Sequence, residues 1–294
     1  MELRPGTIEA NGLRFGFLET GPPQGPLALC LHGFPDSAWS WRHLLADLGG
    51  AGFHAVAPFM RGYHPTEVPA RPLYQSGALA ADACALHQAL GADGRAVLVG
   101  HDWGALATYG AASLAPERWR RVVAMAVPPP PAVAAAFLSY RQLRRSWYMF
   151  FFQMPLAEAA LAMDDMGFLD QLWAEWSPGY DAGRDLARVK DCLRGPANLE
   201  AALGYYRALF DPGRQVPELA REQAATQAPT PQPTLYLHGA DDGCMGVELV
   251  EEETVLGHFG PGSRVEVVPE SGHFLHLEQP ETVDGLVVGF VTGP

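Results

Sequence analysis

Asp102 lies at the centre of the segment whose chemistry is clearest, AVLVGHDWGALATYG. An apolar run predicted to be a buried strand ends at Gly100, and a helix is predicted from Gly104 onward. A strand that turns this sharply into a helix crowds the backbone, so small residues must stand two before and two after the central residue. A carboxylate at the centre can attack carbon without a general base, but the ester it forms must then be hydrolysed. The simpler alternative is that Asp102 only caps the helix.

A second loop is placed to help such an attack. Leu31-His32-Gly33-Phe34-Pro35 directly follows another apolar run that reads as a strand. A loop here can turn the backbone N–H of Phe34 toward the site, where it would form an oxyanion hole with the N–H of Trp103.

A base and its supporting acid are predicted on two later loops. His273, in Ser271-Gly272-His273-Phe274, follows the last predicted strand and can reach the sharp strand-to-helix turn at Asp102, which we call the elbow. We prefer it to His276, which we expect to face the cap or the surface. Asp242 stands three residues after Gly239 in the sequence LHGADD and is preferred to Asp241 because of that spacing. The chain order is then nucleophile, acid, base, which is the hydrolase order.

The elements that must position these residues alternate between strands and helices. Continuous apolar runs of this length are typical of strands buried on both faces, as in a parallel sheet. Asn11-Gly12 separates two N-terminal runs, near Thr7–Glu9 and Leu13–Glu19, and predicts a hairpin, so the sheet begins antiparallel. The other expected strands are Leu27–Leu31, His54–Ala57, Ala96–Val99, Val122–Val127, Thr234–Leu237 and Val265–Val268. The expected helices include Gln75–Leu90, Gly104–Leu114 and Glu281–Phe290.

The alternation stops after Pro128–Pro131 and resumes at Pro233. The intervening residues are rich in aromatic and leucine side chains at helical spacing. We interpret 128–232 as a helical cap inserted into a core domain made of 1–127 and 233–294, because an insertion at a loop is a common way to build a lid. The fold class is therefore α/β, with a mostly parallel, doubly wound sheet.

The totals exclude several classes of protein. The chain has 294 residues and a net charge of −13, with only 20 Lys and Arg, which argues against a nucleic-acid partner. The cluster of Arg141, Arg144 and Arg145 reads as a solvated helix face. The four cysteines show no CxxC spacing, so no disulfide framework or zinc site is predicted, and Cys30 reads as a small buried residue. No signal peptide or membrane span is expected, and we therefore expect a cytoplasmic enzyme.

Taken together, HGFP, GHDWG, GADD and SGHF resemble the α/β-hydrolase-fold epoxide hydrolases, over nearly all of the chain. The resemblance implies that two cap tyrosines donate hydrogen bonds to the epoxide oxygen. By context these are Tyr148, in WYMFFFQMP, and Tyr206, in LGYYRALF. The remaining cap tyrosines considered are interpreted as packing residues: Tyr140, Tyr180 and Tyr205. One departure is Phe59, two before Arg61, where the family usually has an acid. That arginine is normally structural.

The expected reaction is conversion of a small apolar epoxide and water to a diol, through a covalent ester on Asp102, without cofactor or metal. A haloalkane dehalogenase shares the Asp nucleophile and the Trp after it. That family usually has Asn after His-Gly, however, where this chain has Phe34. A non-catalytic binding protein on the same fold is a further alternative, which the complete set of Asp102, Asp242 and His273 disfavours. The sequence leaves open whether the chain associates with itself as a homodimer.

Overall fold

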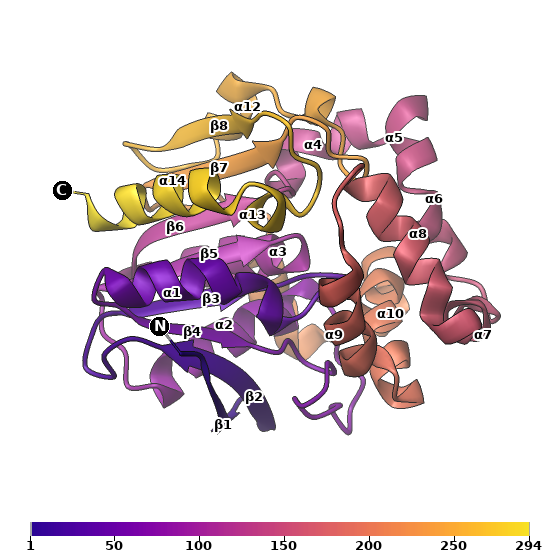
Figure 1. The fold of residues 1–294 in the computed structure, drawn as a ribbon, viewed down its shortest axis with the longest axis horizontal. Coiled ribbons are helices and arrows are strands. Elements are labelled where there is room, and N and C mark those ends of the chain that lie inside the picture. Colours follow the sequence, from indigo (N-terminus) through magenta and orange to yellow (C-terminus); the bar gives the residue numbers. More distant parts are fainter. Residues whose placement is uncertain (1, 294) are drawn as a thin grey trace.

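The computed structural model describes residues 2–293, in which eight strands form one sheet (Figure 1). The strand order across the sheet is β1-β2-β4-β3-β5-β6-β7-β8. The strands are β1 (Arg4–Ala10), β2 (Leu13–Thr20), β3 (Leu27–Leu31), β4 (His54–Pro58), β5 (Ala96–His101), β6 (Trp119–Met125), β7 (Thr234–Gly239) and β8 (Arg264–Val268). Strand β2 runs antiparallel to β1 and β4, and all other neighbours are parallel. The predicted fold class is confirmed.

The strand sequences explain this arrangement. Every residue of β3, β4, β5 and β7 is buried, as the continuous apolar runs predicted for strands covered on both faces. The β1–β2 hairpin turns at Asn11 (φ 48°) and Gly12 (φ 72°), the left-handed pair that a two-residue hairpin loop requires. The largest difference from expectation is β6, which begins at Trp119 and ends two residues before the predicted limit.

Helices cover both faces of the sheet (Figure 1). Helices α1 (Arg42–Gly50) and α14 (Pro280–Thr292) pack against each other on one face. Helices α2 (Ser76–Ala89) and α3 (Trp103–Leu114) pack against each other on the opposite face. Two short helices, α12 (Glu252–Leu256) and α13 (Leu275–Glu278), flank β8 in the sequence. Helix α3 begins directly after Asp102, so the candidate nucleophile lies at the junction of β5 and α3.

The described segment between β6 and β7 is helical. Its α-helices are α4 (Pro130–Phe137), α5 (Tyr140–Arg145), α6 (Trp147–Phe151), α7 (Ala157–Ala162), α8 (Gly167–Trp176), α9 (Gly183–Leu193), α10 (Pro196–Phe210) and α11 (Ala220–Ala225). Most of them gather beyond the carboxyl ends of the parallel strands, at the right of Figure 1, whereas α11 packs on α2 and α3. That 128–232 behaves as a separate cap stays a prediction.

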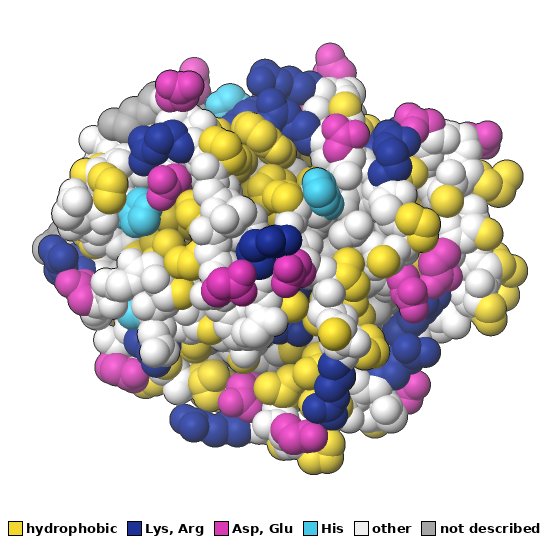
Figure 2. All heavy atoms as spheres, turned by 90° about the horizontal axis from the view of Figure 1, so that it is seen from below, with side chains coloured by type: hydrophobic (Ala, Val, Ile, Leu, Met, Phe, Trp, Pro, Cys, Tyr) yellow, Lys and Arg dark blue, Asp and Glu magenta, His cyan; other side chains and the backbone are white. Residues whose placement is uncertain are grey.

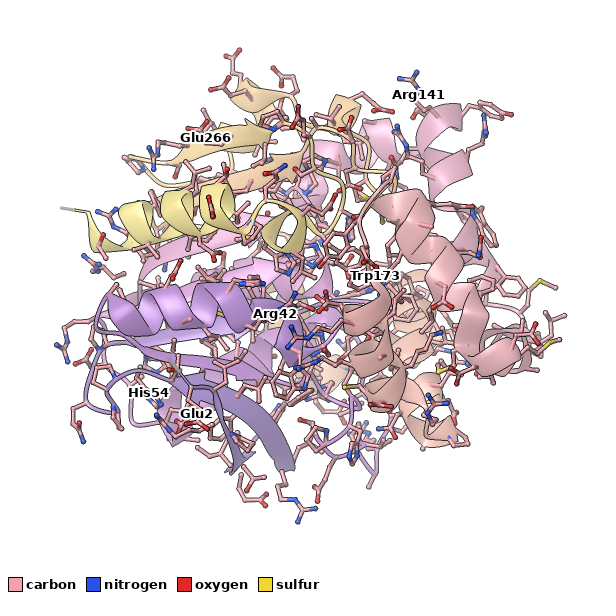
Figure 3. All side chains as sticks on the ribbon, viewed as in Figure 1. Glu2, Arg42, His54, Arg141, Trp173 and Glu266 are labelled. Carbon is pink, nitrogen blue, oxygen red and sulfur yellow. The ribbon has the colours of Figure 1, made fainter. Side chains whose placement is uncertain are left out.

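Specific bonds attach the inserted helices to the sheet domain, at the place where Figure 3 labels Arg42 and Trp173. The indole N–H of Trp173, on α8, donates to the carbonyl of Pro35 over 2.8 Å. Arg42, at the start of α1, pairs with Asp185 of α9 at 2.5 Å. Trp173 is buried, and so are most of the Arg42 and Asp185 side chains. The inserted helices are therefore held over the end of the sheet by polar bonds as well as by apolar packing.

The buried apolar residues of the sheet and of the inserted helices form one continuous cluster, which includes Leu29, Trp103, Tyr148 and Trp173. Cys30 is fully buried within it, as predicted, and all four cysteines are free thiols. Across residues 2–293, no helix has both the length and the apolar character that crossing a membrane demands. On the face seen in Figure 2, acidic and basic side chains are interspersed.

Candidate active site

Asp102 occupies a strained elbow between β5 and α3. Its φ of 54° and ψ of −118° lie in a region that residues with a side chain rarely adopt. A Cβ atom on Gly100 would lie 2.2 Å from the carbonyl oxygen of Gly104, and one on Gly104 would lie 2.0 Å from that of Leu31. The two glycines are therefore needed because backbone passes too close for any side chain. The turn holds the Asp102 carboxylate above the end of the sheet.

Two backbone N–H groups donate hydrogen bonds to the Asp102 carboxylate. The N–H of Phe34 donates to Oδ1 of Asp102 over 2.7 Å, and the N–H of Trp103 also bonds the carboxylate. Gly33 allows this approach, since a Cβ there would lie 2.2 Å from Oδ1 of Asp102. The pair of donors predicted from the sequence is thus brought together on the candidate nucleophile.

His32 fixes the loop that carries Phe34. Its Nδ1 lies 2.9 Å from the carbonyl oxygen of Gly33, and its Nε2 accepts a hydrogen bond from the N–H of Met60 over 2.9 Å. A carbonyl can only accept, so Nδ1 carries the proton and the ring is neutral. Burial lowers the pKa of His32, which agrees with this neutral form. The two hydrogen bonds of the buried His32 ring therefore connect the loop after β3 to the loop after β4.

His273 and Asp242 lie beside Asp102. The Nδ1 atom of His273 is 3.0 Å from Oδ2 of Asp242, and its Nε2 atom is 3.8 Å from Oδ2 of Asp102. The other oxygen of Asp242, Oδ1, accepts the N–H groups of Cys244 and Met245, each over 2.8 Å. Asp241 is exposed. The structure therefore brings together Asp102, Asp242 and His273 and leaves Asp241 outside the site.

The pKa values of Asp102, Asp242 and His273 are shifted in different directions. Burial raises the pKa of Asp102, although nearby His273 and the backbone N–H donors oppose that rise. Burial alone would raise the pKa of Asp242, but His273 holds it below its ordinary value. Burial alone would lower the pKa of His273, but Asp242 outweighs burial and raises it. The imidazole is thus a stronger base than an isolated histidine, and Asp242 stays ionised beside it.

Tyr148, on α6, and Tyr206, on α10, are both buried and approach the same space, with ring centroids 5.7 Å apart. The hydroxyl of Tyr148 lies 3.3 Å from Sγ of Cys244. The hydroxyl of Tyr206 lies close to Trp103 and Tyr148 but makes no hydrogen bond of ordinary geometry within residues 2–293. Burial, reinforced by Asp102 and Cys244, raises both phenol pKa values well above 10. Both hydroxyls therefore stay protonated and can donate.

A cavity of about 300 Å³ adjoins the candidate nucleophile and the two tyrosines. Asp102, Trp103, Tyr148 and Tyr206 all line it. The rest of the lining is mainly apolar. These apolar side chains come from α3, from the inserted helices and from the loops after β6 and β7: Leu106, Val127, Pro128, Pro130, Val133, Ala134, Phe137, Met149, Leu209, Phe210 and Met245. A cavity with apolar walls and a few converging polar groups is typical of a small-molecule site.

Two sequence predictions about individual side chains are wrong. His276 does not face the cap or the surface: it is 1% exposed and stacks on Trp41 beneath the elbow, because α13 turns it inward. Tyr140 does not pack the inserted helices: it is 79% exposed at the start of α5. Tyr205 is buried, and its hydroxyl donates to the carbonyl of Arg61, away from the cavity.

The departure at Phe59 leaves Arg61 with a different partner. The Arg61 guanidinium makes two hydrogen bonds of 2.6 Å to the Asp82 carboxylate, and both side chains are buried. Asp82 lies on α2, outside the local motif, so spacing in the sequence could not reveal the pair. The arginine thus keeps a structural position although the usual acid is replaced by the buried Phe59.

Sequence reasoning missed Cys244, whose thiol lines the cavity between Asp242 and Tyr148. Its position two residues after the predicted acid was the available signal. Two groups of buried side chains within residues 2–293 have the composition and closeness of metal ligands. These groups are Asp242, Cys244 and His273 on one side, and Asp36, His101 and His276 on the other.

Comparison with known proteins shows the family of this chain. A family model described as alpha/beta hydrolase fold matches residues 26–280. The chain is 31% identical to Epoxide hydrolase 4 of Mus musculus, over 97% of this chain and 78% of that relative. It is 35% identical to Epoxide hydrolase 3 of Siraitia grosvenorii, over 97% of each protein. The crystal structure of Epoxide Hydrolase A from Mycobacterium thermoresistibile matches with a TM-score of 0.80 and 26% identity, over 99% of both chains.

The chain belongs to the α/β-hydrolase-fold epoxide hydrolases. This epoxide hydrolase is therefore a hydrolase that acts on epoxides. Its relatives disfavour the haloalkane dehalogenase and the non-catalytic binding protein that the sequence alone left open.

Proposed function

We propose that this epoxide hydrolase converts a small apolar epoxide and water to a vicinal diol, through a covalent ester on Asp102. One observation carries the proposal: the Asp102 carboxylate and the side chains of Tyr148 and Tyr206 line the same apolar cavity. A nucleophile and two proton donors on one cavity match the needs of epoxide opening, in which a carbon is attacked while its oxygen leaves.

In the first step, Oδ2 of Asp102 attacks an epoxide carbon. A new C–O bond to Asp102 forms, and the bond between that carbon and the epoxide oxygen breaks. The electron pair stays on the oxygen, and the Tyr148 and Tyr206 hydroxyls bond that oxygen and supply its proton. Their pKa values, raised by burial, keep both phenols protonated before the attack. The mainly apolar walls of the cavity strengthen these hydrogen bonds to the developing charge.

In the second step, His273 removes a proton from water, and the hydroxide attacks Cγ of Asp102. The negative charge that forms on Oδ1 meets the N–H groups of Phe34 and Trp103, which already bond this carboxylate. The tetrahedral intermediate then breaks the bond from Cγ to the alkyl oxygen, which takes a proton from the His273 imidazolium and leaves as the second hydroxyl of the diol. The acid proton left on Asp102 returns to the tyrosine that gave its proton in the first step, and the enzyme is restored. Asp242 stabilises the imidazolium that forms for the duration of this step. No step of the proposed reaction requires a cofactor.

The cavity suggests the kind of substrate. Apolar walls and a volume of about 300 Å³ suit an epoxide with one aryl or short alkyl substituent. The polar groups near the Asp102 end are the reacting ones, so the epoxide ring is expected there and the substituent toward Val133, Phe137 and Leu209.

Parallel incubations with styrene oxide and with a bromoalkane test this function. Diol formation without halide release supports the proposal. Halide release from the bromoalkane would instead support a dehalogenase, and neither product would support the binding protein. Asp102→Ala serves as the control, because it removes the nucleophile and should abolish diol formation.

We also propose that the enzyme works in the cytoplasm and binds neither nucleic acid nor membranes. Four free, buried thiols suit a reducing compartment, and the net charge of −13 opposes binding to phosphates. For self-association we propose a homodimer, which light scattering of the purified enzyme would distinguish from a monomer.

A further inference from the structure

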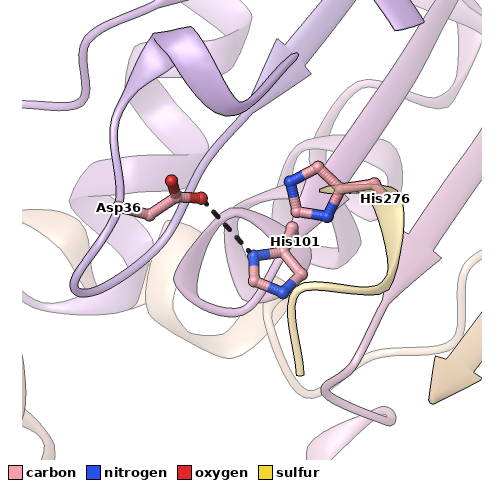
Figure 4. Close-up of side chains that lie close together, drawn as sticks. All are labelled: Asp36, His101 and His276. Atoms are coloured by element: carbon pink, nitrogen blue, oxygen red, sulfur yellow. Dashed lines mark ion pairs between the residues drawn. The ribbon is translucent and has the colours of Figure 1, made fainter. Parts of the chain in front are cut away.

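We propose that Asp36, His101 and His276 form a site for a divalent transition-metal ion, buried behind the catalytic group. Asp36 follows β3, His101 is the last residue of β5, and His276 lies on α13 (Figure 4). All three side chains are buried, and one potential ligand atom from each lies within 4.8 Å of the others. None of the three lines the cavity that contains Asp102 and the two tyrosines, so the proposed metal site lies outside that cavity.

Asp36 offers one oxygen to this site. Its Oδ1 atom accepts the N–H of Ser37 over 2.7 Å and the hydroxyl of Ser40. Its Oδ2 atom is buried and has no hydrogen bond of ordinary geometry within residues 2–293. A carboxylate with one oxygen held by neighbours and the other free has the form of a metal ligand whose orientation is already fixed.

His101 offers one nitrogen. Its Nε2 atom lies 2.8 Å from the carbonyl oxygen of His273, and since a carbonyl can only accept, Nε2 carries the proton. In the neutral ring Nδ1 then presents a lone pair, and it faces Oδ2 of Asp36 at 3.7 Å, the ion pair drawn in Figure 4. A histidine that donates one N–H to a backbone carbonyl and directs its other nitrogen inward is the usual arrangement in metal sites.

His276 adds a third ligand. Neither of its ring nitrogens has a hydrogen-bond partner among the described residues, although the side chain is buried. Its ring stacks on Trp41 at 4.6 Å and lies 4.7 Å from the His101 ring. Buried polar atoms without partners are costly, and here they face one another. A proton on His101 would satisfy Asp36 and His101 but would leave both nitrogens of His276 unpaired.

A metal ion satisfies all three groups at once. Zinc bonds to His nitrogen and carboxylate oxygen at about 2.0–2.2 Å, so neighbouring ligand atoms in a tetrahedral site lie about 3.4 Å apart. The observed 3.7 Å between Asp36 and His101 needs only a small adjustment. Two histidines and a carboxylate suit Zn²⁺, Co²⁺ or Ni²⁺ rather than Mg²⁺ or Ca²⁺. Bound there, the ion would join the Phe34 loop, the elbow and α13.

The test measures metal content and stability, not activity. The enzyme is expressed in medium supplemented with Zn²⁺, dialysed against metal-free buffer and analysed by inductively coupled plasma mass spectrometry. We expect about one Zn²⁺ per chain. His276→Leu should lose the ion, while Cys244→Val, which removes the thiol of the competing ligand group, should retain it. Peripheral His258→Leu is the control for non-specific histidine binding. Addition of Zn²⁺ to the chelator-treated enzyme should raise the melting temperature of the natural chain by a few degrees, but not that of His276→Leu.

Cobalt distinguishes the two ligand groups in the natural chain and does not depend on a variant folding correctly. Co²⁺ at Asp36, His101 and His276 gives visible ligand-field bands without the strong near-ultraviolet charge-transfer band of a thiolate. A thiolate band, or loss of the metal in Cys244→Val, would move the site to Cys244 and overturn the proposal. An enzyme that binds no Zn²⁺ or Co²⁺, or a His276→Leu variant that keeps its full metal content, would overturn it as well.

Discussion

The backbone N–H of Phe34 donates to Oδ1 of Asp102 over 2.7 Å, and this single bond assigns different tasks to the two carboxylate oxygens. In the proposed reaction Oδ2, which faces His273 at 3.8 Å, is the oxygen that attacks the epoxide. Oδ1 would then become the carbonyl oxygen of the ester, and it already accepts the Phe34 N–H of the proposed oxyanion hole. One loop therefore serves both steps of the proposed reaction.

His273→Gln should trap the ester, because opening of the epoxide does not need the base but hydrolysis does. Incubation with styrene oxide should add the mass of one substrate molecule to the intact protein. Digestion should locate the addition on Asp102. An unshifted mass in a variant that is folded by circular dichroism would argue against covalent catalysis.

A single turnover of the natural enzyme in water enriched in ¹⁸O should label the protein before it labels the diol. Hydroxide attacks Cγ of Asp102, and the alkyl oxygen that leaves comes from the carboxylate, so the new oxygen stays on the enzyme. Mass spectrometry of the peptide that contains Asp102 measures the label. Label found first in the diol would indicate direct attack of water on the epoxide.

Tyr148→Phe and Tyr206→Phe should each slow ester formation by about 10-fold to 100-fold, and the double variant by about 10⁴-fold. Each phenol supplies one of the two donors to the epoxide oxygen, so loss of both leaves the developing alkoxide without a partner. Stopped-flow measurement of tryptophan fluorescence in single turnovers would follow the step. Tyr205→Phe is the matched control, because its hydroxyl bonds the Arg61 carbonyl and does not line the cavity. An equal loss in Tyr205→Phe would indicate a packing effect.

Asp242→Asn should lower the turnover rate by about 10³-fold or more and move the acid limb of ester hydrolysis to lower pH. His273 must be neutral to act as a base, and Asp242 raises its pKa. Without that charge, burial dominates and the pKa falls, so the ring loses its proton at a lower pH. The rate of ester hydrolysis against pH measures this shift. Exposed Asp241→Asn should leave the profile unchanged.

Asp284→Asn should stabilise the enzyme at alkaline pH. Asp284, on α14, is buried with its Oδ1 unpaired, and burial next to Asp47 raises its pKa from 3.8 to about 8. The folded state therefore holds a proton that the unfolded state releases, and stability falls as pH rises from about 4 to about 8. We expect the variant to gain about 2 kcal/mol at about pH 8 and much less at about pH 5. Urea unfolding at both pH values measures it, and equal gains at both would contradict the prediction.

The local sequence determined the parts of this protein that depend on backbone crowding and strand patterning. Gly100 and Gly104 are required wherever a strand turns this tightly into a helix, so the elbow could be recognised from spacing alone. Continuous apolar runs predicted the buried parallel strands, and Asn11-Gly12 predicted the hairpin. The spacing from Gly239 predicted Asp242 as the acid that contacts His273. The contact forms because Asp242 and His273 lie on short loops that follow two adjacent strands, β7 and β8.

Only the tertiary structure decided what each side chain meets across the sequence. The pair of Arg61 and Asp82, the thiol of Cys244 beside Tyr148, and the inward turn of His276 onto Trp41 all join elements that are distant in the chain. Periodicity predicts which face of an element is buried, but it does not predict the partner on another element, because that depends on how helices pack over the end of the sheet. For the same reason, periodicity did not predict the pair of Tyr148 and Tyr206, which only the resemblance to a family indicated. The packing of α6 against α10 places this pair at the same cavity as Asp102.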